Sequence, residues 1–225
     1  MIKDILNLDY TPFLISFKLA SVTTLSLFII ALPLAWWLSR TNSKIKPFIE
    51  AFSALPLVLP PSVLGFYLLT LFSKNSIFGG FLEKFDINLL FSFSGLVVAS
   101  IIYSFPFMLQ PLQSGFESLN NSMIEQSFIA KKNTFTTIFK VALPNIKPSL
   151  LTALIVTFAH TIGEFGVVLM VGGSIPSETK VASVAIYEMV EIMDYKSAHI
   201  YSAIMLILSF FVLFSVYIFN KKSKV

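Results

Sequence analysis

The sequence predicts an all-α integral membrane protein, and three observations lead to this fold class. The 225 residues are 56% hydrophobic and only 12% charged, whereas average globular domains are roughly 25% charged. Five stretches are long and apolar enough to cross a bilayer as helices, which takes about 20 residues each. The charges between these stretches are distributed unequally over alternate connections. Helices are expected because an open sheet in lipid would leave backbone groups without hydrogen-bond partners.

The five expected membrane spans are assigned in chain order from their runs of apolar residues. They cover residues 13–38, 48–72, 95–114, 149–171 and 200–219. The length of the chain fits one compact unit, so residues 1–225 are expected to form a single transmembrane domain. An odd number of spans places the two termini on opposite sides of the membrane.

The charged residues predict the orientation of these spans. One set of connections holds ten basic and three acidic residues, and the other holds five basic and eight acidic residues. Cytoplasmic connections carry the excess of Lys and Arg, so the first set is predicted to be cytoplasmic. The N-terminus is then outside, and the C-terminal tail with Lys221, Lys222 and Lys224 is inside, as in a multi-pass protein of a bacterial cytoplasmic membrane. The net charge of +4 therefore reflects topology and does not indicate nucleic-acid binding.

The composition also excludes most catalytic chemistry. The chain has no cysteine and two histidines, which removes thiolate metal sites, iron–sulfur clusters and cysteine nucleophiles. No Gly-x-x-x-x-Gly-Lys-Ser/Thr sequence occurs, so no phosphate-binding loop for a nucleotide is predicted. We expect no catalytic residue, no metal site and no cofactor bound by this chain.

The longest predicted cytoplasmic connection, residues 115–148, has a structure of its own. Apolar residues over 123–141 recur at helical spacing on both sides of a break near Lys132, which predicts helix, turn, helix. The second helix is expected to end near Pro144. Two interpretations remain open. The pair could lie in the membrane interface, anchored by Phe128, Phe135 and Phe139, or it could present a short helix to a groove on a cytoplasmic partner.

Within this loop, Glu125-Gln126-Ser127 and the later Leu143-Pro144 resemble the "EAA" loop of bacterial ABC importer permeases. That family has two alanines where this chain has Gln126 and Ser127, and a glycine where it has Lys131. Glycine adopts left-handed conformations more easily than lysine does, so a slightly continued helix is expected here. The resemblance implies that contact with an ATPase subunit is made by Glu125, Gln126, Ser127, Ala130 and Lys131.

Two further segments narrow the resemblance. Residues 55–67, LPLVLPPSVLGFY, are similar to the second span of molybdate and tungstate permeases. Residues 161–166, TIGEFG, with the following GGSIP and Ala185-Ile186-Tyr187, resemble the fourth span and the next loop of the same permeases. The similarity runs from about residue 10 to 220 in one order. Sulfate permeases share the Gly-Glu-aromatic-Gly segment but differ in the Leu-Pro-Pro stretch.

The resemblance implies a permease subunit of an ABC importer that passes an oxyanion into the cytoplasm, with molybdate as the expected substrate. Implied partners are a second copy of this chain, two cytoplasmic ATPase subunits that use ATP and Mg²⁺, and an external oxyanion-binding protein that docks on the outer loops 73–92 and 172–197. Sulfate, thiosulfate and tungstate remain alternative substrates. An uncoupled channel or a membrane scaffold remains the alternative of another class, although no filter-like loop or charged ring is present.

Two segments are candidates for the transport pathway. Pro56, Pro60 and Pro61 fall inside the second expected span, where each removes a backbone donor. They form either a kinked structural helix or a bend that lines the pathway. In the second case the pathway or gate residues are Pro60, Pro61, Gly65, Phe66, Gly163, Glu164 and Phe165.

Glu164 is the single acidic residue deep inside an expected span. It must face protein or water, because exposing a carboxylate to lipid is unfavourable by several kcal/mol. A carboxylate repels an oxyanion, so a role as substrate ligand is disfavoured. Glu164 is instead expected to accept hydrogen bonds from Ser, Thr or backbone groups, with His160 one turn earlier as a partner.

Overall fold

The computed structural model of the chain describes residues 8–222, and the described part is helical without strands. Three helices are long and apolar enough to cross a membrane, namely α2 (Thr11–Arg40), α6 (Phe93–Glu117) and the Tyr195–Ser215 part of α13 (Tyr195–Lys222). They match the first, third and fifth expected spans. Two bent helix pairs, Lys46–Val58 with Pro61–Phe72 and Thr134–Asn145 with Lys147–Ile162, give up to five spans if each pair counts as one. The charges at Lys3, Asp4 and Lys224 lie outside the described residues.

The second expected span, residues 48–72, is two helices and not one continuous helix. α3 (Lys46–Val58) and α4 (Pro61–Phe72) are bent by 110° at a short break. Pro60 has an extended backbone, with φ −54° and ψ 137°, and Pro61 opens α4 at the position where proline suits a helix. Consecutive prolines thus end one helix and begin the next.

The fourth expected span, residues 149–171, is also divided. α10 (Lys147–Ile162) ends at Gly163, and a shorter helix, α11 (Gly166–Gly172), follows after Phe165. Two short helices in the connections were not expected from the sequence. They are α5 (Ile77–Glu83), capped by the Ser76 hydroxyl, and α12 (Ala182–Glu191).

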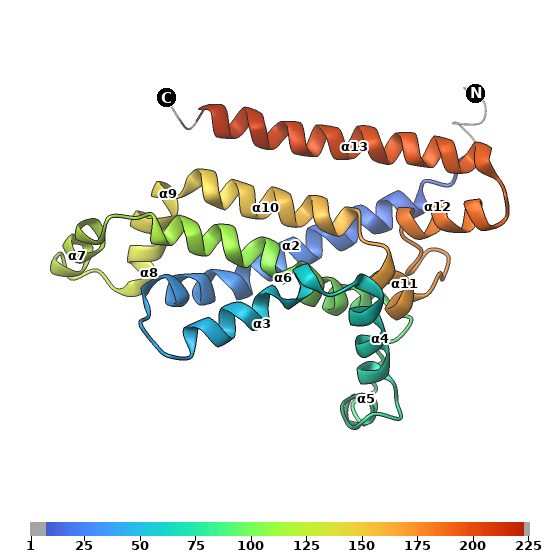
Figure 1. Cartoon of the computed structure of the whole chain (residues 1–225), viewed down its shortest axis with the longest axis horizontal. Helices are drawn as coiled ribbons and strands as arrows, with labels where there is room; N and C mark the ends of the chain where they lie inside the picture. The colour runs from blue at the N-terminus through green and yellow to red at the C-terminus, as the bar shows by residue number, and fades with distance from the viewer. Residues whose placement is uncertain (1–7, 223–225) are drawn as a thin grey trace.

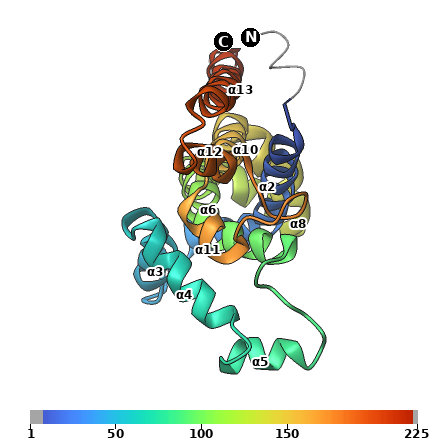
Figure 2. The same cartoon turned by 90° about the vertical axis from the view of Figure 1, so that its right-hand side faces the viewer.

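The centre of the fold consists of α2, α6 and α10, which lie side by side (Figures 1 and 2). Residues with little or no side chain, such as Ala31, Ala35 and Ala153, are fully buried between them, and small residues allow close helix approach in membranes. The largest buried cluster adds Leu27, Leu38, Met108, Leu112 and Phe116. α13 packs on α10 and α12 at the edge, whereas α4 and α5 project away from the body.

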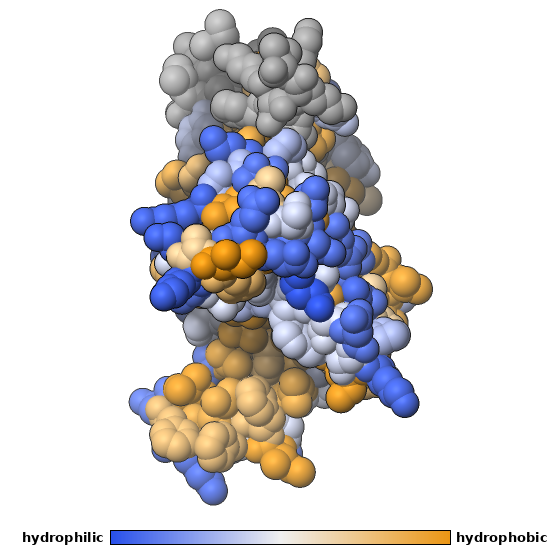
Figure 3. Space-filling view, turned by 90° about the vertical axis from the view of Figure 1, so that its left-hand side faces the viewer, coloured by the Kyte–Doolittle hydropathy of each residue, from blue (hydrophilic) through white to orange (hydrophobic). Residues whose placement is uncertain are grey.

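The connection that holds α7 and α8 lies at one end of the molecule and the connection that holds α12 lies at the other, whereas the connection with α5 lies on the projecting arm (Figure 1). The ends of α2 and α6 and the start of α10 lie near α7 (Asn121–Ile129) and α8 (Thr134–Thr137). This end is mainly hydrophilic (Figure 3). The start of α13 and the short helix α12 lie at the other end. One predicted cytoplasmic connection and one predicted external connection thus lie at opposite ends.

Candidate coupling element and transport pathway

The predicted helix–turn–helix over 123–141 is confirmed. α7 is followed by α8, the π-helix η1 (Ile138–Ala142) and α9 (Leu143–Asn145). Asn side chains start both halves: Asn120 accepts from Ser122 N at 3.0 Å, and Asn133 accepts from Thr136 N at 2.8 Å. Such caps satisfy backbone donors that a helix start leaves free. The segment is thus defined locally by its own sequence.

The turn after α7 is a Schellman motif, and Lys131 occupies its left-handed position. Lys131 has φ 56°, its N–H donates to Phe128 O at 2.8 Å, and Lys132 N donates to Ser127 O at 3.1 Å. These two bonds define the motif. The expectation that α7 continues slightly past Lys131 was wrong, because the two backbone bonds hold the lysine in the conformation that glycine usually adopts.

The predicted coupling residues fall into two groups. Glu125, Gln126, Ala130 and Lys131 are exposed at the hydrophilic end of the molecule. Ser127 is buried, and its hydroxyl lies 2.9 Å from Thr137 Oγ1 of α8. Ser127 therefore connects the two halves of the loop and does not face outward. The strongly exposed apolar residues Ile129 (80%) and Phe135 (68%) were not predicted as partner contacts.

The loop is attached to the helical bundle by apolar packing and by one polar contact. Ile124 and Ile138 belong to the main buried cluster with residues of α2 and α6. Arg40, at the end of α2, donates to Asn121 Oδ1 at 2.8 Å. α7 is consequently a packed part of the bundle and not a free surface loop.

The two predicted pathway segments meet in the structure, because α4 packs on α11. A Cβ added at Gly65 would lie 3.0 Å from Met170 Cβ, and one added at Gly166 would lie 3.0 Å from Pro61 Cβ. Both glycines thus allow contact that a larger residue would prevent. Pro60, Phe66 and Gly163 are exposed beside this junction, and the Phe165 ring lies 5.0 Å from that of Tyr187.

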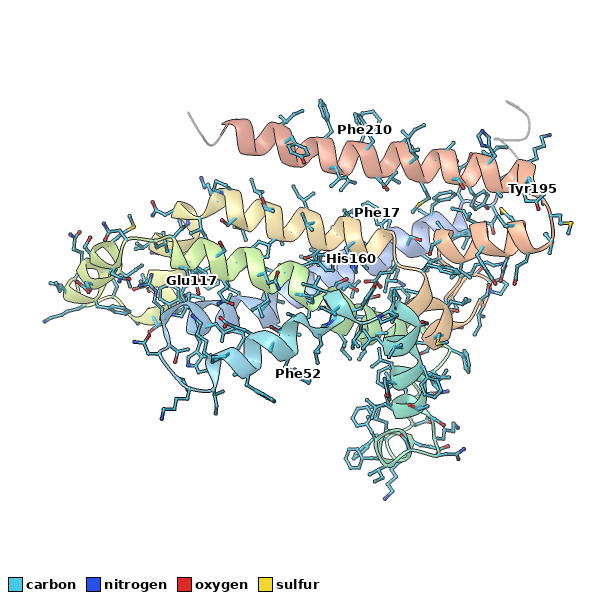
Figure 4. The ribbon with its side chains drawn as sticks, viewed as in Figure 1. Phe17, Phe52, Glu117, His160, Tyr195 and Phe210 are labelled. Atoms are coloured by element: carbon cyan, nitrogen blue, oxygen red, sulfur yellow. The ribbon has the colours of Figure 1, made fainter. Side chains whose placement is uncertain are left out.

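A groove between α3, α4 and α6 was not predicted from the sequence. Its apolar part has a volume of about 450 Å³, and its lining includes Phe52, Pro56, Ile101 and Phe105. At Ser53 it adjoins a polar part of about 250 Å³, lined also by Glu50, Gln110, Gln113, Ser114 and Glu117. Phe52 and Glu117 are labelled in Figure 4. Polar residues at 110 and 113, one turn apart in an apolar helix, are the signal in the sequence that could have indicated it.

The polar part of the groove contains a bridge between α3 and α6. Gln113 Nε2 donates to Glu50 Oε1 at 2.6 Å and to Glu117 Oε1 at 3.0 Å. Lys46 Nζ lies 3.1 Å from Glu117 Oε1 and 3.7 Å from Glu50 Oε1. The Gln113 amide and the Lys46 ammonium group therefore each contact two carboxylates, that of Glu50 on α3 and that of Glu117 on α6.

Glu164 lies in the break between α10 and α11 and is only 3% exposed. Its Oε2 accepts from Ser100 at 2.5 Å and its Oε1 accepts from Ser104 at 2.6 Å, both on α6. His160 Nδ1 lies 3.4 Å from Oε1. The carboxylate thus has the serine and histidine partners expected from the sequence. Among residues 8–222 no group of three or more His, Cys, Asp or Glu side chains is arranged to hold a metal ion.

At the opposite end, the outer connection is ordered by an ion pair. Lys180 Nζ lies 2.5 Å from Glu188 Oε2 of α12. Burial alone would raise the pKa of Glu188, but the hydrogen bond and the charge of Lys180 outweigh this and lower it. This segment is one of the two loops expected to face an external partner.

Comparison with known proteins decides the family. The family described as "Binding-protein-dependent transport system inner membrane component" matches residues 16–225. The chain belongs to this family. It is a multi-pass protein of the cytoplasmic membrane.

Two relatives differ in their sequence identity to this chain. The "Molybdenum transport system permease protein ModB" of Azotobacter vinelandii is 45% identical over 210 residues, covering 93% of each chain. A probable sulfate transport system permease protein, cysT of Prototheca wickerhamii, is 31% identical and covers 94% of this chain and 85% of its own. Identity to the molybdenum permease is thus clearly higher over a similar extent.

Solved structures confirm the fold. The methionine transporter MetNI, in an inward-facing conformation, matches with a TM-score of 0.73 and 16% identity over 94% of each chain. A bacterial alginate ABC transporter in complex with a periplasmic protein matches with a TM-score of 0.70 and 16% identity, covering 91% of this chain and 77% of its own. The helical arrangement is therefore that of ABC importer permeases.

The left-handed Lys131 generates a stability prediction for the coupling element. Replacing it with glycine (Lys131→Gly) is expected to stabilise the turn by up to about 1 kcal/mol, because glycine adopts this conformation without steric strain. Lys131→Val is expected to destabilise it, since a β-branched residue is a poor fit at positive φ. Hydrogen exchange of the 121–137 amides measures both effects. Equal protection in the two variants would contradict the assignment.

Proposed function

We propose that this chain is the permease subunit of an ABC importer that carries molybdate into the cytoplasm. The observation that supports this most strongly is the 45% identity, over 93% of each chain, to a molybdenum transport permease. The division of the chain into a path through the membrane and an exposed coupling helix fits the proposal. Transport would follow alternating access, in which helices move between inward-open and outward-open states.

In this proposal the chain crosses the membrane five times, with the N-terminus outside and the C-terminus in the cytoplasm. The bent pair α3 and α4 would then form one crossing, and α10 with α11 would form the fourth, while α8, η1 and α9 would stay at the cytoplasmic end. The excess of Lys and Arg near α7 and α8 supports a cytoplasmic position for that end. The whole chain would act as one transmembrane domain.

We assign ATP hydrolysis to two separate ATPase subunits, each of which would receive one copy of α7. The exposed Glu125, Gln126, Ala130 and Lys131 would make the contact, together with the apolar Ile129. Ser127 would support this surface from inside through Thr137. The chain itself would be neither an enzyme nor a binder of ATP or Mg²⁺.

The remaining partners follow from the two ends and the lateral surface. An external oxyanion-binding protein would dock on loops 73–92 and 172–197, and the alginate transporter solved with a periplasmic protein offers a parallel. A second copy of the chain would cover the exposed apolar surface of α3 and α4, which includes Phe48, Phe52, Val58, Phe66 and Tyr67. The substrate would then pass between the two copies.

Sulfate is the second candidate substrate, because sulfate permeases at 31% identity cover nearly the whole chain. Tungstate has the same charge and tetrahedral shape as molybdate, so a site that recognises shape and charge would accept both. An uncoupled channel or scaffold is disfavoured, since neither would need the packed and exposed coupling helix.

The absence of cysteine from the natural chain permits a direct test of orientation. Single replacements Asn75→Cys and Lys131→Cys change exposed residues, the first in the proposed outer loop 73–92 and the second in the proposed cytoplasmic loop. In intact cells a membrane-impermeant maleimide is expected to label the first variant only, and both after permeabilisation. Labelling of Lys131→Cys in intact cells would reverse the proposed orientation.

The coupling surface is tested by changes that alter α7 without touching buried groups. Glu125→Arg reverses an exposed charge and Ala130→Trp adds bulk at an exposed position. Both variants are expected to insert and dimerise but to lose association with the ATPase subunits in co-purification. Glu178→Arg, an exposed change at the opposite end, is the matched control and should keep the ATPase. Normal assembly of both α7 variants would refute the coupling role.

Uptake measurements test the proposed substrate. Proteoliposomes containing this chain, its ATPase and its binding protein are expected to accumulate labelled molybdate in an ATP-dependent manner. Unlabelled tungstate should compete at concentrations similar to molybdate, whereas sulfate should require a large excess. Competition by sulfate at the same concentration would favour the second candidate, and uptake without ATP would favour the channel.

A further inference from the structure

The cluster around Glu164 raises a question of charge that the hydrogen-bond geometry answers. Glu164 is 3% exposed, and its partners Ser100 and Ser104 are fully buried. An unpaired carboxylate at this depth is strongly unfavourable in a membrane. The side chain must therefore either be protonated or have a positive charge beside it.

The distances fit an ionised carboxylate. Ser100 donates to one oxygen at 2.5 Å and Ser104 donates to the other at 2.6 Å. Hydrogen bonds from a hydroxyl to a charged oxygen have lengths of about 2.5–2.7 Å, shorter than those between neutral groups. Because both oxygens accept such bonds, neither has to carry a proton.

Ser104 then determines the protonation of His160. Its oxygen lies 2.6 Å from Glu164 Oε1, 2.9 Å from His160 Nδ1 and 2.9 Å from Thr161 Oγ1. A serine hydroxyl has one hydrogen and two acceptor sites. With the hydrogen directed to Glu164, Ser104 can only accept from the other two groups, and Thr161 shares its single hydrogen between Ser104 and the backbone oxygen of Thr157 at 3.0 Å. His160 Nδ1 must therefore carry a hydrogen and donate it to Ser104.

The surroundings of His160 favour a charged ring over a neutral one. The Nδ1 atom lies 3.4 Å from Glu164 Oε1, and the ring stacks on Phe107 with centroids 3.9 Å apart. The Tyr103 ring, whose hydroxyl is the other titratable group among these neighbours, lies 4.8 Å away. Aromatic faces attract cations, and a charged imidazole makes the cluster electrically neutral. His160 lies in the middle of the bundle (Figure 4).

We propose that the half-buried His160 and the buried Glu164 form an imidazolium–carboxylate pair, bridged by Ser104, that fixes the break between α10 and α11. Glu164 is then a positioning residue. Its side chain binds α6, and its backbone oxygen accepts from Ser183 of α12 at 2.5 Å. The next helix, α11, packs through Gly166 on Pro61 of α4. The effect on transport rests on the proposed function, but the charge state of the pair does not.

Nuclear magnetic resonance can observe the pair directly, because the chain has only two histidines. The assembled transporter in lipid bilayers is labelled with ¹⁵N-histidine in this chain, and His199→Gln removes the signal of the exposed histidine. Both ring nitrogens of His160 are expected to be protonated at pH 7. In Glu164→Gln the ring should become neutral. A neutral His160 ring beside native Glu164 would overturn the proposal.

A double-mutant cycle provides the second measurement. His160→Asn retains an N–H donor near the Nδ1 position but removes the charge, so it should lower the melting temperature of the assembled transporter. Glu164→Gln should also lower it, and the double variant should be less affected than the sum of the two. His199→Asn is the control and should leave melting unchanged. Additive losses would exclude mutual charge pairing.

The positioning role is tested by a variant that keeps the charge but shortens the side chain. Glu164→Asp should retain the protonated His160 signal and the ATPase association, yet lose most of the uptake per ATP hydrolysed. Unchanged uptake in this variant would refute the positioning role. Failure of the proposed function itself would be recognised separately, as absence of uptake by the native complex.

Discussion

Helix breaks within the membrane impose the constraint on which the rest of this structure depends, because backbone groups freed there have no water to bind. The two breaks satisfy it in different ways. At Leu59–Pro61, two of the three residues are prolines, which have no N–H group to leave free. Leu59 N still donates to Leu55 O, and Pro60 O accepts from Val63 N. At Gly163–Phe165 the donors are retained: Gly163 N donates to Ala159 O and His160 O, and Glu164 N donates to Thr161 O. The Glu164 backbone oxygen accepts from the Ser183 hydroxyl of α12.

The two breaks also explain why α4 and α11 meet. Each helix begins directly after a break, so each is free to leave the direction of the helix before it. Their contact is close because Gly65 faces Met170 and Gly166 faces Pro61. The predicted pathway residues at 60–66 and 163–165 therefore lie close together because each group adjoins one of the two helix breaks. A pathway built on breaks can change shape by rotating short helices, with little repacking of α2, α6 and α10.

The sequence predicted the elements for which the signal is local. Apolar runs indicated α2, α6 and α13, Asn120 and Asn133 begin the helices expected in the 123–141 segment, and the prolines indicated a disturbance near residue 60. The 110° angle at that break depends on packing between distant helices and could not be predicted. α5 and α12 were missed because short helices in polar connections lack an apolar run of membrane length.

The candidate site was predictable to a similar extent. The position of Glu164 inside an expected span was enough to predict that its carboxylate needs hydrogen-bond donors. Ser100 and Ser104 share one face of α6 because they are four residues apart, but the sequence does not say that this face meets the α10–α11 break. Lys131 illustrates the opposite limit. Its intrinsic preference opposed a left-handed turn, and the two backbone bonds of the Schellman motif outweighed a penalty of only about 1–2 kcal/mol.

The route from α7 to the break explains how a contact at the hydrophilic end can act in the middle of the membrane. From Thr134 the chain runs through α8, η1 and α9 into α10 with one interruption, at Ile146, where the helices are bent by 87°. Ile138, Ala142, Leu143 and Ile146 are all buried in the main cluster. In the proposed coupling, displacement of α7 would move the start of α10, and this single helix of 16 residues would carry the movement to His160 and to Glu164 just beyond its end. The Lys46–Glu117 contact between α3 and α6 is partly exposed, and such pairs contribute about 1 kcal/mol or less. The Lys46–Glu117 contact could therefore rearrange with the same movement, whereas buried Glu164 would lose hydrogen bonds that nothing else replaces. The α10–α11 break is thus held to α6 more strongly than α3 is. This difference favours rotation of the helices about the break over their separation.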